Sequence, residues 1–106
     1  MLIEMGAETS SRDDTNWTPL DYAAQKGHPA VVVLLLENDA PVDAEDKKRT
    51  TPLQHAAANG NTDCISILLD EGAKIDHTDE DGKTCLDLAV ENGHVDACMA
   101  LMQHER

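Results

Sequence analysis

The sequence predicts an all-α solenoid in which pairs of short helices repeat along the chain. One observation is an internal repeat: the seven-residue block that starts at Thr18 recurs at Thr51 and at Thr84, an offset of 33 residues in both steps (51 − 18 and 84 − 51). The other is that each block is followed by a glycine and then by a segment with apolar residues at helical spacing. One helix therefore ends at each glycine and a second helix follows it.

The first helix of each pair begins at the repeated block. A threonine can cap a helix through its hydroxyl, and a proline at the first helical position fixes φ without losing a useful hydrogen bond. The blocks are Thr18-Pro19-Leu20-Asp21-Tyr22-Ala23-Ala24, Thr51-Pro52-Leu53-Gln54-His55-Ala56-Ala57 and Thr84-Cys85-Leu86-Asp87-Leu88-Ala89-Val90. We expect first helices at 19–26, 52–59 and 85–92. Each ends at a glycine in the left-handed conformation, namely Gly27, Gly60 and Gly93.

The second helix of each pair carries the apolar stripe that forms the core between repeats. Leu35 and Leu36 in one repeat correspond to Leu68 and Leu69 in the next, and small alanines in the first helices let neighbouring repeats approach closely. We expect second helices at 30–37, 62–71 and 95–104.

The period, the T-P-L-H-x-A-A block, the Gly27-His28 and Gly93-His94 pairs and the Gly72-Ala73 and Gly6-Ala7 pairs together resemble the ankyrin-repeat family. The resemblance covers residues 2 to 104. It implies a unit of a β-turn plus two helices, with β-hairpin fingers at 40–50 and 73–83. The departures are local: Asn16 and Arg49 replace the turn glycine that Gly82 retains, and Cys85 replaces proline.

The register divides the chain, taken as one ankyrin-repeat domain (1–106), into the end of a preceding repeat (1–12), two full repeats (13–45 and 46–78) and a truncated one (79–106). A terminal repeat should carry polar residues on its outer face, yet Val90, Met99 and Met102 are apolar, and Leu2 and Ile3 fit the end of a preceding helix. We therefore expect the native array to continue at both ends, and the chain to self-associate through these apolar residues.

Composition excludes several classes of function. A formal charge of −13, from 21 acidic and 8 basic side chains, argues against nucleic acid, because phosphate binding needs clustered Lys and Arg; a basic or neutral protein partner fits better. No apolar run approaches the roughly 20 residues that direct membrane insertion requires. The three cysteines show no C-x-x-C spacing, which argues against a disulfide framework or a zinc site. Their odd number favours a reducing compartment such as the cytoplasm.

The motifs of catalysis and of cofactor binding are missing from the sequence. It shows no nucleophile elbow and no phosphate-cradling glycine loop, so we expect no enzyme activity and no cofactor. The acidic segment 76–82 fails the calcium-loop pattern, since position one would be His77 and position twelve Leu88. Cys85, at a helix N-terminus, is the one candidate reactive thiol; the alternative is an inert capping-position thiol.

The resemblance implies that a protein partner binds the concave surface made by the fingers and the first helices. The positions are Asp14, Thr15, Trp17, Gln25, Lys26, Lys47, Lys48, Thr50, Ala58, Asn59, Glu80, Asp81, Lys83, Glu91 and Asn92. Trp17 is either an interface hot spot or a residue that packs across the finger base. Lys47-Lys48-Arg49 either pairs with an acidic partner or is a solvated turn.

The sequence thus predicts a protein–protein interaction scaffold within a longer ankyrin array. An alternative comes from the run 87–94 followed by Met99-Ala100-Leu101-Met102, which is similar to late repeats of the ankyrin-type transient receptor potential channels. That similarity implies a structural or sensing segment of a channel's cytosolic array.

Overall fold

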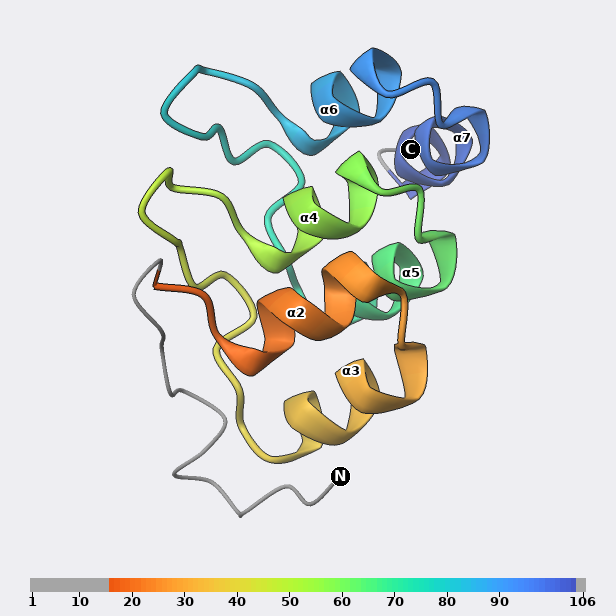
Figure 1. Cartoon of the computed structure of the whole chain (residues 1–106). Helices are drawn as coiled ribbons and strands as arrows, with labels where there is room; N and C mark the ends of the chain where they lie inside the picture. The colour runs from red at the N-terminus through yellow and green to blue at the C-terminus, as the bar shows by residue number, and fades with distance from the viewer. Residues whose placement is uncertain (1–15, 105–106) are drawn as a thin grey trace.

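The structure is a computed structural model that describes residues 16–104. Within this range the chain forms three helix pairs (Figure 1). The pairs are α2 (Pro19–Lys26) with α3 (Pro29–Glu37), α4 (Pro52–Ala58) with α5 (Thr62–Asp70), and α6 (Cys85–Glu91) with α7 (Val95–His104). Every expected helix is present, and no observed end differs from the expected end by more than one residue. The predicted all-α solenoid is confirmed.

The helices form two layers. The first helices stack as α2, α4 and α6, and the second helices stack beside them as α3, α5 and α7, so each pair packs on the next through both layers (Figure 1). The core between the layers is aliphatic: Leu20, Leu53, Ile65 and Leu68 are fully buried. The apolar stripe expected on the second helices is therefore the inter-repeat core.

Capping boxes start all three first helices. In each box the threonine hydroxyl accepts the backbone N–H of the residue three positions later, and the side chain of that residue accepts the threonine N–H, so two otherwise unpaired backbone donors are satisfied. The boxes pair Thr18 with Asp21, Thr51 with Gln54 and Thr84 with Asp87. The expected threonine caps are thus confirmed, and the glycines that follow these helices all have positive φ, as expected.

The segments between the helix pairs project as loops on one side of the stack (Figure 1); we call residues 40–50 the second finger and 73–83 the third finger. The β-hairpins expected there are not seen, because no strand occurs within residues 16–104. The backbone pairs only near each tip, where Asp46 N–H donates to Thr50 O (3.0 Å). In a β-ladder, Thr50 N–H would donate back to Asp46 O, but here it donates to the Asp46 side chain (2.9 Å). A backbone N–H that bonds to a side chain cannot extend a β-ladder.

The tips of the fingers keep one backbone conformation despite sequence departures. Asn16 and Arg49 have φ of 65° and 64°, close to the 77° of Gly82 at the corresponding position. Asn tolerates this left-handed region, whereas a long side chain such as Arg adopts it at a cost. The turn is therefore set by the repeat architecture and not by the presence of glycine.

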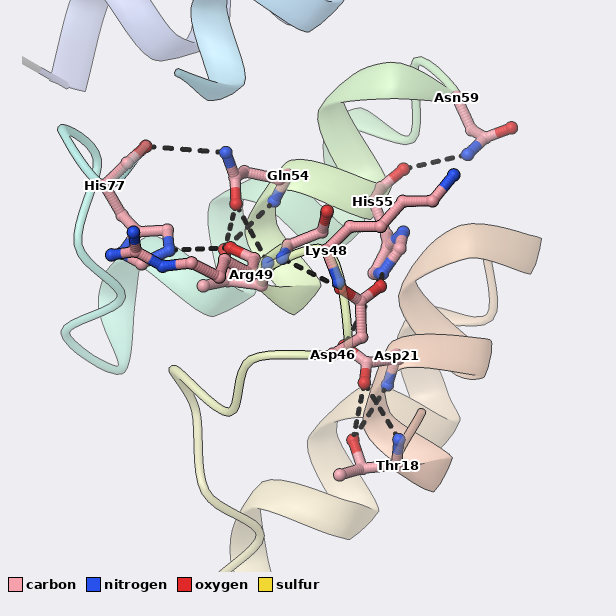
Figure 2. A network of polar contacts seen from close by, with 11 residues as sticks. Thr18, Asp21, Asp46, Lys48, Arg49, Gln54, His55, Asn59 and His77 are labelled. Atoms are coloured by element: carbon pink, nitrogen blue, oxygen red, sulfur yellow. Dashed lines mark hydrogen bonds and ion pairs between the residues drawn. The ribbon is translucent and has the colours of Figure 1, made fainter. Parts of the chain in front are cut away.

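Polar side chains join neighbouring repeats. Gln54 Nε2 donates to Lys83 O in the third finger (2.8 Å). Figure 2 shows its longer bond to His77 O (3.4 Å) and the contact of His77 Nε2 with Arg49 O in the second finger (2.8 Å). Behind the helices, Asn61 Nδ2 donates to Ala24 O (2.7 Å). Because these bonds satisfy backbone carbonyls across the repeat boundary, they fix the position of each finger relative to the next.

The third pair exposes several apolar side chains. No further helix covers α6 within the described part of the chain, so Val90 is 62 % exposed although Ala57, at the same repeat position, is fully buried. The other exposed apolar residues of this pair are Val95, Met99 and Met102. Leu2 and Ile3, which belong to the same prediction, lie outside the described residues. Across residues 16–104, none of the helices combines the length and the apolarity needed to cross a bilayer.

Candidate functional site

A groove of about 480 Å³ opens between the second finger and the ends of α2 and α4. Its lining residues are Trp17, Gln25, Asp46, Lys47, Lys48, Thr50, His55, Ala58 and Asn59. The second finger supplies its rim and the two helices supply its wall. We call it the Trp17 groove.

Seven of the predicted binding positions meet in this groove. They are Trp17, Gln25, Lys47, Lys48, Thr50, Ala58 and Asn59. Lys26 is exposed in the last turn of α2, beside the groove but not in its lining. Asp14 and Thr15 lie outside the described residues. The fold therefore brings positions from two repeats, more than 40 residues apart in the sequence, into one hollow.

The predicted positions of the last repeat do not line the groove. Glu80 and Asp81 are exposed at the tip of the third finger. The Lys83 ammonium and the Glu91 carboxylate form an ion pair, and the hydrogen bond to Glu91 raises the pKa of Lys83. Asn92 caps its own helix, because its Nδ2 donates to Leu88 O (2.8 Å). These residues lie outside the groove, although the third finger adjoins the second through the hydrogen bond from Glu80 N–H to Lys48 O (2.9 Å).

Trp17 takes part in an aromatic cluster at the groove. Its ring lies 4.1 Å from the His55 ring and 4.8 Å from the Tyr22 ring, both in tilted arrangements. The indole is half-buried and at the same time lines the groove. Trp17 therefore packs at the finger base, which is one of the two interpretations of the sequence, and it also presents ring surface to the hollow; its role as an interface hot spot stays a prediction.

A buried polar cluster lies beneath the groove. His55 Nε2 is 3.2 Å from Asp46 Oδ2 and 3.9 Å from Asp21 Oδ1, and all three side chains are almost inaccessible to water (Figure 2). Asp46 Oδ1 accepts the backbone N–H groups of Lys48 (2.8 Å) and Thr50 (2.9 Å). The Asp46 carboxylate thus ties the second finger to α4 through His55.

Burial lowers the pKa of His55 below its ordinary value of 6.5, while the charge of Asp46 and the hydrogen bond to it act in the opposite direction. Two carboxylates within 4 Å favour the imidazolium, yet the loss of water around the ring outweighs them. His55 is therefore neutral at neutral pH.

The low pKa of His55 predicts a pH dependence of stability. In the window between the lowered folded pKa and 6.5 the unfolded chain binds more protons than the folded chain, so the free energy of unfolding should rise with pH through this window and level off above it. We expect His55→Gln to flatten this rise in urea unfolding curves measured between about pH 5 and pH 8.

The matched control for this experiment is His104→Gln, which changes an exposed histidine at the end of α7. It should keep the pH dependence of the parent. An unchanged slope in His55→Gln would show that other groups cause the dependence.

Two residues of the groove, Asp46 and His55, were not among the predicted binding positions. The sequence does carry a signal for the first, because Asp46 and Asp79 recur at the repeat period, and both carboxylates close their finger in the same way. Asp79 Oδ1 accepts the N–H groups of Asp81 (2.9 Å) and Lys83 (3.0 Å). His55 carries no such signal, because its ring contacts come from different repeats.

The candidate reactive thiol lies in an environment typical of a structural residue. Cys85 is buried and its Sγ donates to Ile75 O (3.3 Å), which is a contact of a protonated thiol. All three cysteines are free. Among residues 16–104, no group of three or more His, Cys, Asp or Glu side chains is placed to hold a metal ion.

Comparison with known families accounts for this architecture. A family model described as ankyrin repeats (3 copies) matches residues 38–106, and a model of the single ankyrin repeat matches residues 15–47. The chain belongs to the ankyrin-repeat family. A search of curated proteins returned no significant match.

Membership confirms the resemblance derived from the repeated block and sets the class of function. Ankyrin repeats are generally modules for protein–protein interaction, and they are typically scaffolds without enzymatic activity. In this ankyrin-repeat chain the Trp17 groove lies among the fingers and first helices, where the family resemblance placed partner binding.

Proposed function

We propose that this ankyrin-repeat chain is a scaffold that binds a protein partner through the Trp17 groove and the adjoining concave face. The observation that supports the proposal is the meeting of seven predicted binding positions in one hollow with an exposed part of an indole ring. Tryptophan is enriched among interface hot spots, and hot spots are found in pockets whose surroundings exclude water. The positions in 79–106 belong to the same face, at its acidic end.

The groove can be blocked without touching the core. Ala58 lines it near the end of α4, and Ala58→Tyr adds a bulky uncharged side chain there. We expect affinity capture from an extract of the source cells to recover a protein with the parent chain and at least about tenfold less of it with Ala58→Tyr, a loss of about 1.4 kcal/mol. Quantitative mass spectrometry measures the ratio.

The control is Ser66→Tyr, which adds the same side chain at an exposed position of α5, away from the groove. It should retain the partner at the parent level. If both variants and the parent capture every protein equally, the groove is not the binding surface.

We propose in addition that the chain self-associates through the apolar face of α6 and α7. Val90, Val95, Met99 and Met102 are each more than half exposed, and apolar patches of this kind mark association sites. The net charge of −13 opposes association at low salt and is screened near physiological ionic strength, where the Debye length is about 8 Å. Association should therefore increase with salt in sedimentation experiments.

A variant with Val90→Lys and Met102→Gln should remain monomeric under the same conditions. A parent chain that stays monomeric at high salt and high protein concentration would exclude this mode of association, and so would a variant that associates as readily as the parent.

We propose repeat boundaries at 13–45, 46–78 and 79–106, preceded by the end of a repeat at 1–12, and a reducing compartment such as the cytoplasm, which three free cysteines favour. No observation on the described residues favours the channel alternative, and it stays a prediction from the sequence.

A further inference from the structure

We infer that the Trp17 groove accepts an acidic protein segment in which a carboxylate side chain lies next to an apolar one. The inference rests on the proposed function and names the chemistry of the partner. Three features of the groove's described lining carry it: two lysines that form no ion pair within residues 16–104, the inward orientation of Asp46 and the apolar character of the surface.

The rim of the groove carries two lysines that form no ion pair with another residue of the described range. Lys47 and Lys48 are exposed and line the groove. Of the ion pairs within the described part of the chain, none involves either lysine, whereas Arg49 and Lys83 are each paired with a glutamate. In a chain with 21 acidic and 8 basic residues, two adjacent lysines without a carboxylate partner are positioned to receive one from another molecule.

Asp46, the acidic residue in the lining, does not neutralise these lysines. Its side chain is buried, with one oxygen accepting the N–H groups of Lys48 and Thr50 and the other facing His55 at 3.2 Å. The Asp46 oxygens are thus engaged inside the protein. Among the described lining residues, the charged groups exposed to a ligand are Lys47 and Lys48.

The surface between the lysines and the helices is mostly apolar. The ring of Trp17 supplies part of it, and Ala58 leaves space where the corresponding residues of the other repeats are Gln25 and Glu91. A volume of about 480 Å³ holds a large apolar side chain. A partner that fills it places its neighbouring residues at the rim, within reach of the flexible lysine side chains.

The net charge of the whole chain points to a basic or neutral partner, whereas the described lining of the groove points to an acidic one. The third finger adjoins the second, because Glu80 N–H donates to Lys48 O (2.9 Å). The exposed carboxylates of Glu80 and Asp81 nevertheless do not line the groove, and no ion pair within the described residues joins either of them to Lys47 or Lys48. An acidic segment of a partner would therefore meet the lysines in the groove, while basic residues elsewhere in the same partner can face the third finger.

The test is a selection of random peptides displayed on phage against the immobilised chain, with counter-selection on Ala58→Tyr. The peptides retained should combine Asp or Glu with a large apolar residue. For the most enriched synthetic peptide, Lys47→Glu and Lys48→Glu should each weaken binding at least about tenfold at low salt, and less as salt increases. Lys74→Glu reverses the charge of an exposed lysine outside the groove and should change binding less than about twofold.

The outcomes separate the two proposals. Groove-dependent peptides that are basic or uncharged, or that bind the Lys47→Glu and Lys48→Glu variants as well as the parent, overturn the acidic preference and leave the binding function standing. A selection that yields no peptide sensitive to Ala58→Tyr overturns the function as well. Thermal melts followed by circular dichroism must match the parent for every variant compared.

Discussion

Leu68→Ala should lower the free energy of unfolding by about 2–5 kcal/mol, the cost of truncating a fully buried leucine. Leu68 is completely buried on α5, the second helix of the middle pair, which packs against α4 and also against α3 and α7. A cavity at this position therefore weakens both repeat boundaries at once. Because small domains are stable by only about 5–15 kcal/mol, this single change can remove a large share of the total.

The matched control is Leu34→Ala, the same substitution on α3 at a position that is 42 % exposed. Urea unfolding of both variants should separate them clearly, with a loss below about 1 kcal/mol for Leu34→Ala, as for most surface changes. A loss of that size for Leu68→Ala would mean that the stack tolerates a cavity at its centre, and would contradict the packing register.

The helices could be predicted closely because their signals are local in the sequence. Thr51-Pro52 fixes the start of α4 through a cap and a fixed φ, and Gly60 marks the end of the helix by its left-handed conformation. These signals recur at the repeat period, so each helix end is in effect predicted three times. The buried stripe followed in the same way from the helical spacing of Ile65 and Leu68.

The fingers and the groove depend on contacts that no local pattern specifies. The β-hairpin expected in the second finger fails to form because the Asp46 side chain takes the backbone donor that a ladder needs. The cluster below the groove joins Asp21 of α2, Asp46 of the finger and His55 of α4. A repeat period shows that such residues recur, but not which side chains meet across the boundary between two repeats.

Trp17 shows the same limit for a binding residue. Its position in the repeat indicated two roles, and the sequence could not choose between them. The structure adds the ring contacts with His55 and Tyr22, together with the exposed ring surface in the groove. Substitution of Trp17 must therefore be read against a variant that loses similar ring packing but keeps the groove wall.

Trp17→Ala should weaken the binding of a groove-dependent partner by about 2 kcal/mol or more, roughly a thirtyfold increase in Kd. Part of the groove wall is lost, and with it the apolar surface that the partner covers. The stability of the chain should fall as well, because aromatic pairs contribute about 0.5–1.5 kcal/mol beyond the area that they bury. Isothermal titration calorimetry with the selected peptide measures the affinity, and thermal melts measure the stability.

Tyr22→Ala provides the comparison. It removes the ring that packs on Trp17 at 4.8 Å, but Tyr22 does not line the groove. We expect it to lower stability by a similar amount and to leave the affinity within about threefold of the parent, a change under 1 kcal/mol. If Trp17→Ala instead lowers the melting temperature strongly and leaves the affinity unchanged, the indole acts by packing the finger base, and the partner draws its binding energy from the rim of the groove.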